Sequence, residues 1–515
     1  MKTNSSILIA LLTGALATSA AMKKEWQIEF GYGLGYPANP ASGKAFIRML
    51  DGLTIVGDPE EGLAWEGSVY VFTNDYTGYL VLSQILKDQS GYPGGGWFGY
   101  CAVHAETYGK KLVIIGSTHS SEPIYDGEGD AQVFLLDDQT KQLSFVQLLH
   151  DTNIVMSLTE FSSTMAADKE WLFIGGPWHF YGGTNRTGGL WIYRFDGELY
   201  IKWQFVIIEW TVNGNFSVTT AIDGTNAVIN AGNTSSYPTG GYGHNFWLTL
   251  DPDTQLWGFR GYVRHNNWPI GGEYFGSDSI CLKGTNLVMM APCRALSYAM
   301  GRYYYFHLDD SGWKHVASYY PTNVELRGLW GRFSTMEYVP GTDSNKLKLL
   351  VSGRNEDSDG SWWWNMPAKG KMWDFELEGT NITLLEVLAP ADREMGDWFG
   401  SDGATDGVNV WSLSAGAYRN GYKTMIMTKF SPTDLVITNM AAIPSPVSEA
   451  LPQGGILLEW LDLDGHAYNY TVESTTDLSE QDWAPVPGAL WPVMTNRIVV
   501  SLPAGDSLFF RIKAE

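Results

Sequence analysis

The chain has 515 residues and a formal net charge of −23, with 56 acidic and 33 basic side chains. This acidic balance argues against sequence-independent binding to nucleic acid or to an anionic membrane, because both depend on clustered Lys and Arg. Its 58 Gly, 22 Trp and 27 Tyr, with only 17% charged residues, indicate an all-β protein made of short strands and tight turns.

Residues 1–21 are expected to be a secretory signal peptide. Lys2 gives a positive start, residues 7–17 form an apolar run too short to span a bilayer, and small residues follow that run. No later stretch has the roughly 18 apolar residues that a membrane helix needs. We therefore expect an exported chain, secreted or at the cell surface, with no transmembrane segment.

The first expected strand covers residues 26–30 and precedes any repeat. In a closed ring of sheets, a strand from the N-terminus can complete the last sheet. We expect residues 26–30 to do so. The alternative is that residues 435–440 complete that sheet, while residues 26–30 pack outside it.

The chain then repeats one unit seven times. Each unit has an aromatic–Gly pair or its equivalent, an apolar strand, a tight turn, a second apolar strand ending on small residues, a loop and a third strand. In the clearest copy, residues 273–306, Gly284 provides the turn. One unit cannot bury both faces of its own sheet, so the copies must stack on one another. The copies begin at Phe46, Phe98, Phe161, Phe216, Phe275, Phe333 and Phe399.

Three units begin with the triplets WFG at 97–99, YFG at 274–276 and WFG at 398–400. These triplets, with the small-residue ends of the second strands, resemble FG-GAP repeats, the blades of the seven-bladed β-propellers of integrin α type. The resemblance implies such a propeller over residues 22–443.

Blades of that family often carry an Asp-rich calcium loop between their first and second strands. The turns here contain one acid at most, as in Asp51-Gly52, Asp223-Gly224 and Asp406-Gly407. We therefore expect no calcium in these hairpins, and no metal or other cofactor.

The three cysteines, Cys101, Cys281 and Cys293, cannot form a complete set of disulfides. We expect them to fill small spaces in the core. A disulfide between Cys281 and Cys293 is the alternative.

Residues 444–515 follow a Pro-Ser-Pro linker and lack the repeat. They contain short alternating strands, with Trp460 in an early strand and Tyr468 or Tyr470 in the next. This segment resembles a small fibronectin-III-like or immunoglobulin-like β-sandwich, of the kind appended to bacterial secreted proteins. The expected fold class is therefore all-β, with a seven-bladed β-propeller followed by a small β-sandwich.

In propellers of this type, the loops after the second strands share one face with the loops between blades. Large aromatic rings in such loops do not contribute to the propeller core, so they bind a ligand or bury one another in a cap. Aromatic rings stack on the C–H faces of sugars, and neighbouring polar groups bind the hydroxyls. The expected ligand-binding residues are Trp178, His179, Tyr181, His265, Trp268, Arg354, Trp362, Trp363 and Trp364.

Three functions remain open at this point. The first is an exported recognition or adhesion protein that binds an extracellular glycan or protein ligand. The second is a carbohydrate-active enzyme, a polysaccharide lyase or hydrolase, with His179, His244 or His265 as base. No catalytic motif is present, so no catalytic residue is assigned and the sequence favours binding. The third is a structural envelope or matrix component.

Overall fold

The computed structural model describes strands and turns, with no helix among the described residues. None of the described residues therefore forms a helix long and apolar enough to cross a membrane. The described residues are 22–30, 45–59, 61, 66–74, 80–90, 96–118, 129–150, 161–177, 180–181, 185–186, 188–207, 216–231, 244–265, 275–276, 279–291, 302–319, 334–340, 346–353, 369–394, 397–415, 418–419, 422–423, 425–432, 437–443, 455–460, 470–475, 484–485, 497–501 and 509–514.

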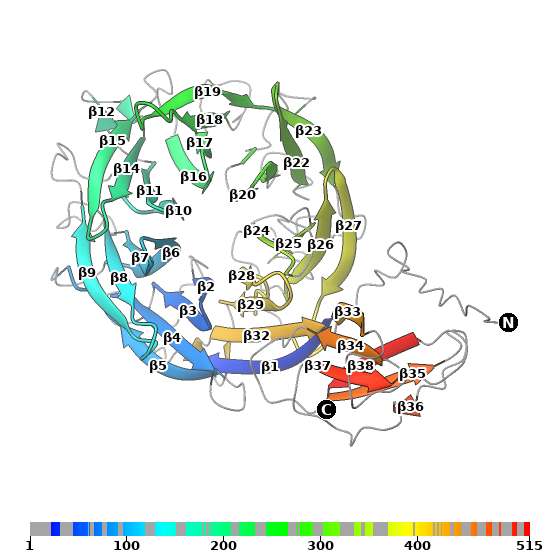
Figure 1. Cartoon of the computed structure of the whole chain (residues 1–515). Coiled ribbons are helices and arrows are strands. Elements are labelled where there is room, and N and C mark those ends of the chain that lie inside the picture. Colours follow the sequence, from blue (N-terminus) through cyan, green and yellow to red (C-terminus); the bar gives the residue numbers. More distant parts are fainter. Residues whose placement is uncertain are drawn as a thin grey trace. The chain divides into compact units, whose positions relative to one another are not determined.

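The chain divides into two compact units. One comprises Lys24–Thr73 and Leu80–Phe430, and the other comprises Met1–Lys23, Asn74–Tyr79 and Ser431–Glu515. The larger unit is a ring of seven four-stranded sheets, which confirms the seven-bladed, all-β propeller (Figure 1). In each blade the first strand borders the centre of the ring, and the fourth strand forms its outer edge.

The seven blades follow one another in chain order. Blades 1 to 3 contain β2 (Phe46–Leu50), β3 (Leu53–Asp58), β4 (Ser68–Asn74) and β5 (Leu80–Leu86); β6 (Phe98–Thr107), β7 (Lys110–Ser117), β8 (Asp130–Leu136) and β9 (Leu143–Leu149); and β10 (Thr164–Asp168), β11 (Trp171–Gly176), β14 (Gly189–Phe195) and β15 (Tyr200–Val206). Blades 4 and 5 contain β16 (Phe216–Asp223), β17 (Asn226–Ala231), β18 (His244–Leu250) and β19 (Trp257–Val263); and β20 (Ile280–Lys283), β21 (Asn286–Ala291), β22 (Arg302–Asp309) and β23 (Gly312–Tyr319). Blades 6 and 7 contain β24 (Ser334–Tyr338), β25 (Lys346–Gly353), β26 (Lys371–Glu378) and β27 (Asn381–Leu388); and β28 (Asp402–Thr405), β29 (Val410–Ser414), β32 (Met425–Pro432) and β1 (Met22–Phe30).

The ring is closed by the N-terminal strand. In blade 7, β1 pairs with β32, so residues 26–30 complete the last sheet as expected. The alternative, completion by residues 435–440, is wrong, because β33 (Ile437–Ile443) pairs with β34 (Gly455–Trp460) in the smaller unit.

The smaller unit contains two three-stranded sheets. Their strand orders are β33-β34-β37 and β36-β35-β38, and all their pairs are antiparallel. The remaining strands are β35 (Tyr470–Thr475), β36 (Ala484–Pro485), β37 (Arg497–Ser501) and β38 (Phe509–Ala514). The likeness to fibronectin-III or immunoglobulin modules and the boundary at residues 443 and 444 stay predictions. Residues 1–21 lie outside the described residues.

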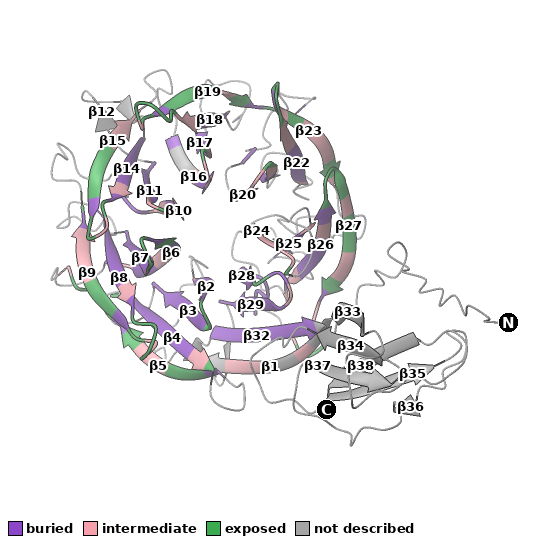
Figure 2. Ribbon diagram, in the orientation of Figure 1, coloured by how far each residue is buried: buried purple, intermediate pink, exposed green. Residues whose placement is uncertain are grey.

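The strands of a blade differ in burial because neighbouring blades cover both faces of each sheet. The second strands β3 and β11 are buried at every position, whereas β5 on the outer edge is buried only at its first and last residues (Figure 2). Continuous apolar runs are typical of strands that are buried on both faces. This is why the second strands could be recognised from sequence.

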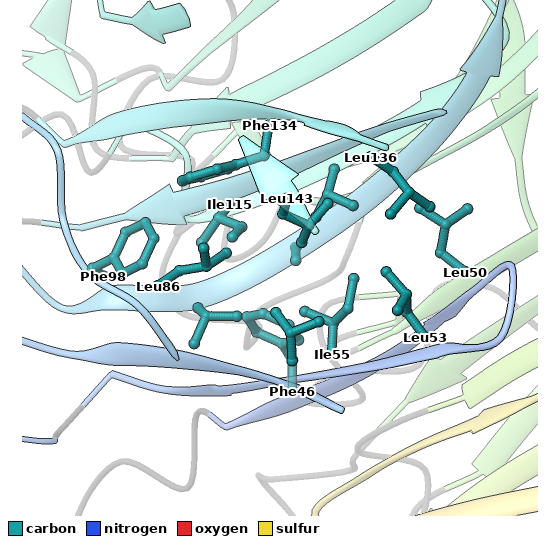
Figure 3. Close-up of a cluster of buried hydrophobic side chains, with 14 residues drawn as sticks. Phe46, Leu50, Leu53, Ile55, Leu86, Phe98, Ile115, Phe134, Leu136 and Leu143 are labelled. Carbon is teal, nitrogen blue, oxygen red and sulfur yellow. The ribbon is translucent and has the colours of Figure 1, made fainter. Parts of the chain in front are cut away.

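Apolar clusters hold six of the seven seams between blades. Figure 3 shows the first of them, in which Phe46 and Ile55 of blade 1 pack against Phe98, Ile115 and Phe134 of blade 2. Comparable clusters join blades 2 and 3, 3 and 4, 4 and 5, 5 and 6, and 7 and 1. Each blade thus buries surface that it could not bury alone.

The seam between blades 6 and 7 differs, because the described residues form no such cluster there. The face of blade 6 that points away from blade 5 carries Lys348 and Asp374, both buried, with Nζ 2.9 Å from Oδ2. The second carboxylate oxygen, Oδ1, has no hydrogen-bond partner among the described residues. Ser412 and Thr428 of blade 7 are also buried on the face that meets blade 6. We call this seam the polar seam, because this ion pair and these hydroxyls are buried there beside apolar side chains such as Leu350 and Met372.

A glycine before the third strand touches the next blade in four of the repeats. Gly188, with φ of +69°, lies so near the backbone of Phe216 that an added Cβ would be 2.4 Å from its carbonyl oxygen. Gly67, Gly129 and Gly370 approach Phe98, Phe161 and Phe399 in the same way. Four of the phenylalanines that mark the repeat in the sequence are thus the residues whose backbone the glycine of the previous blade contacts.

A glutamine on the outer strand links three successive seams. Gln84 of β5 donates to Leu143 O at 2.8 Å and accepts from Leu143 N at 2.9 Å. Gln147 binds Tyr200 and Gln204 binds Trp257 in the same two-bond pattern. Each amide side chain satisfies an N–H and a C=O at the start of the next outer strand.

Two cysteines lie in described positions. Cys281 is buried with a free thiol, its Sγ lies 3.0 Å from Ser334 Oγ, and burial raises its pKa to about 12. The core-filling prediction is confirmed for Cys281. Cys101 Sγ donates to Ser162 O at 2.9 Å. Cys293 lies outside the described residues.

Substitution of Gly188 by alanine tests the contact between blades. Gly109 is a matched control, because its φ is also +69° and nothing lies within 4 Å of an added Cβ. Both variants carry the strain of positive φ, about 1 to 2 kcal/mol. We expect Gly188→Ala to lower the free energy of unfolding by about 1 to 3 kcal/mol more than Gly109→Ala, since it also forces backbone apart. Urea unfolding measures the difference, and equal losses would contradict the contact.

A double-mutant cycle tests the polar seam. Lys348→Met leaves the Asp374 carboxylate buried without its cation, and we expect a loss of about 3 to 5 kcal/mol of stability. Lys348→Met with Asp374→Leu replaces the whole pair by apolar groups, and we expect it to be as stable as the natural chain or more stable by about 1 to 4 kcal/mol. Thermal and urea unfolding provide both values. If the double variant were as unstable as the single one, the ion pair itself would stabilise the contact between blades 6 and 7.

Candidate functional site

We call the side of the propeller on which second strands end and third strands begin the loop face. In blade 3, β11 ends at Gly176 opposite Gly189 of β14, and in blade 6, β25 ends at Gly353 opposite Lys371 of β26. The loops 177–188 and 354–370 leave from these paired ends. Because all blades share one strand order around the ring, both loops emerge on the loop face.

Most of the predicted ligand-binding residues lie in these loops and outside the described residues: Trp178, His179, Trp268, Arg354, Trp362, Trp363 and Trp364. Tyr181 belongs to a short hairpin, in which β12 (Phe180–Tyr181) pairs with β13 (Asn185–Arg186). A second short hairpin, β30 (Tyr418–Arg419) with β31 (Tyr422–Lys423), lies in the corresponding loop of blade 7. Two loops of this face therefore contain regular backbone pairing.

His265 is the one predicted residue whose side chain is described, and it lies in the seam between blades 4 and 5. It is 4% exposed, and its ring stacks on Tyr304 with centroids 4.5 Å apart. The ring of Phe275 meets it edge-on at 5.1 Å. These are packing contacts of a core residue, and ligand binding by His265 stays a prediction.

His244 and Arg264 are described at the loop face beside this seam. His244 begins β18, and Arg264 follows β19 with its guanidinium 4.5 Å from the ring centroid of Tyr262. Burial lowers the pKa of His244, and Arg264 lowers it further. A neutral imidazole at pH 7 can both donate to and accept from a hydroxyl group.

On the opposite side, the turns between first and second strands use their acids to join blades. Asp168 Oδ2 accepts from Gly224 N, and Asp223 Oδ2 accepts from Gly284 N, each at 2.7 Å. Asp51 pairs with Lys141 and Lys111, whose hydrogen bonds lower its pKa to about 2. These three carboxylates therefore already have partners.

The centre of the ring carries a charged group that the sequence analysis missed. Arg48 of β2 pairs with Asp402 of β28 at 2.9 Å, and Lys283 of β20 pairs with Glu337 of β24 at 2.9 Å. His104 of β6 is exposed nearby, and all five residues lie on first strands. The available signal was the recurrence of a charged residue or a histidine in the first strands of five repeats.

No protein-family model matches this chain, and no curated protein matches it. Solved structures that resemble it include the periplasmic gluconolactonase of Pseudomonas aeruginosa, with a TM-score of 0.43 and 10% identity over 89% of this chain and 98% of that one. Others are Trypanosoma rangeli sialidase with the inhibitor DANA, at 0.39 and 11% over 87% of both chains, and a putative 6-phosphogluconolactonase from Bacteroides fragilis, at 0.37 and 11% over 78% and 97%. These similarities are too weak to assign an activity.

Calcium should leave the propeller hairpins unchanged. A calcium ion needs about six to eight oxygen ligands, whereas Asp51, Asp168 and Asp223 bind lysines or N–H groups of the next blade, and Asp406 binds N–H groups of its own turn. We expect the same melting temperature for EDTA-treated protein with and without millimolar calcium, since a ligand of the native state alone would raise it. A rise of several degrees would contradict this expectation.

Proposed function

We propose that this protein is an exported recognition or adhesion protein whose FG-GAP-like propeller binds an extracellular ligand, a glycan, through its loop face. The ligand-binding residues proposed are the aromatic, His and Arg side chains of loops 177–188 and 354–370, with Tyr181 on the hairpin of the first loop.

One observation carries this proposal. Strands β11 and β25 end on the same face, so the Trp178–Tyr181 segment and the Trp362–Trp364 segment start from a common side of a rigid ring. Pairing of β12 with β13 fixes the backbone on either side of residues 182–184 in the first loop. Rigid strands that present variable loops are a common arrangement for binding.

The chemistry of these loops fits a carbohydrate better than other ligands. Adjacent rings such as Trp362, Trp363 and Trp364 offer flat apolar surface for the C–H faces of sugar rings. His244 and Arg264, at the same face, supply polar groups that can bind hydroxyls. A ligand site of this kind combines mostly apolar surface with a few polar groups.

Alanine substitutions at Trp178 and Trp362 test the proposal. We expect each to weaken binding to a glycan, first identified on an array with the full chain, by about 1 to 3 kcal/mol, as for an aromatic hot spot. The melting temperature should change little. Trp203→Ala is a control, because Trp203 is 41% exposed on the outer strand β15. If Trp178→Ala or Trp362→Ala instead costs about 3 to 5 kcal/mol of stability, the rings are buried in a cap.

A further inference from the structure

The inner edge of the ring holds side chains from three blades whose charges act on His104 of a fourth blade. The positive charges of Arg48 of β2 and Lys283 of β20 lower the pKa of His104 of β6. The negative charge of Glu337 of β24 raises it. These first strands all border the ring centre in Figure 1. His104 is exposed and Arg48, Lys283 and Glu337 are partly exposed, so solvent reaches these side chains.

Arg48 lies across the inner edge of three blades. Its Nε donates to Ala102 O of β6 at 2.9 Å, and its Nη1 donates to Ile47 O at 2.7 Å and to Asp402 Oδ2 of β28 at 2.9 Å. The guanidinium has five N–H groups in a fixed plane, and those on Nη2 have no described partner. The bonds therefore fix the guanidinium in place and leave one of its edges unused.

His104 and Lys283 also keep unused hydrogen-bond donors. Neither ring nitrogen of His104 has a partner among the described residues, although the side chain lies on the strand whose Ala102 receives Arg48. Lys283 Nζ, which has three N–H groups, binds the Glu337 carboxylate at 2.9 Å and 3.2 Å and lies 5.4 Å from the ring centroid of Tyr338; Glu337 is its one hydrogen-bond partner among the described residues.

We propose that Arg48, His104 and Lys283 form an anion-binding site at the ring centre that takes a carboxylate group. We call these three residues the axial site. It is separate from the loop-face aromatics, and it does not depend on the proposed glycan binding.

The charges favour one negative charge over two. Arg48 and Lys283 already face Asp402 and Glu337, and Asp223 also acts on Lys283, so their positive charges are balanced before any ligand binds. Glu106, two residues along β6 from His104, is also exposed and negative. A carboxylate brings a single negative charge, which His104 can neutralise by taking up one proton. A doubly charged phosphate would leave one negative charge without a counter-charge.

His104 can take up a proton on binding because its imidazole is neutral before the ligand binds. Although solvent reaches the His104 side chain, the protein that surrounds it at the ring centre disfavours its charged form and lowers its pKa; Arg48 and Lys283 lower the pKa further, and Glu337 raises it. The imidazole is therefore neutral at pH 7 before binding. A bound carboxylate stabilises its protonated form, so we infer that affinity falls as the pH rises through the range of about 5 to 8.

The test is isothermal titration of the full chain with glucuronate, glucose and acetate at constant ionic strength. We expect glucuronate to bind and neutral glucose not to bind, with an affinity that falls by at most about tenfold per pH unit because one proton is taken up. Heats in buffers of different ionisation enthalpy should show that proton. Acetate binding as tightly as glucuronate would assign the site to a free carboxylate, and tighter glucuronate binding would assign it to a sugar acid.

Three variants separate the site from its surroundings. His104→Gln should remove the pH dependence without loss of stability, since His104 has no described bonds to lose. Lys283→Gln should weaken binding by about tenfold or more, through loss of a charged donor. His150→Gln is the matched control, because His150 is exposed just after the outer strand β9.

Equal binding of glucose and glucuronate, or an unchanged pH dependence in His104→Gln, would overturn the proposal. Trp178→Ala and Trp362→Ala should not affect glucuronate binding.

Discussion

At four seams of this seven-bladed ring, a glycine lets the backbone of the next blade come very near. At Gly67, Gly129, Gly188 and Gly370 a side chain would overlap the carbonyl oxygen of the following phenylalanine. Each of these glycines also has positive φ, which other residues adopt only with strain. The contact brings neighbouring sheets into register, and the apolar clusters form on either side of it.

The seams also differ in the side chains that fill them. Six of them rest on apolar clusters, which are non-directional and tolerate small shifts. Three of those six also carry the glutamine link on the outer strands, which fixes how far one blade is displaced along the next. Between blades 6 and 7 the buried Lys348–Asp374 pair lies beside apolar side chains such as Leu350 and Met372. Buried pairs of this kind add little net stability, but they require a defined geometry.

The repeat could be predicted from the sequence because its markers are local. A phenylalanine at the start of each unit, a glycine turn and an apolar second strand are each visible within a few residues, and stacking then follows from unburied faces. The N-terminal strand could be predicted by the same reasoning, because a closed ring needs one more strand than the seventh unit supplies.

The missed features depend on residues that are far apart in the chain. Arg48 and Asp402 meet across 354 positions, so a charged residue in each first strand does not by itself show that these side chains come together. Lys348 alternates with leucines in β25, which suggests a solvent-facing side, yet blade 7 covers that side. His265 follows a strand and would be expected in a loop, but the chain carries it between Phe275 and Tyr304.

The strand that closes the ring also sets the order in which the protein can fold. Strand β1 is the first described segment, and its partner β32 is completed only at residue 432. Closing so long a loop costs little more entropy than closing a shorter one, because that cost grows with the logarithm of length, but such distant pairing is slow. During synthesis from the N-terminus, six sheets can therefore form before β1 pairs with β32. Blade 7 remains a three-stranded sheet with an open edge until the two ends of the propeller meet.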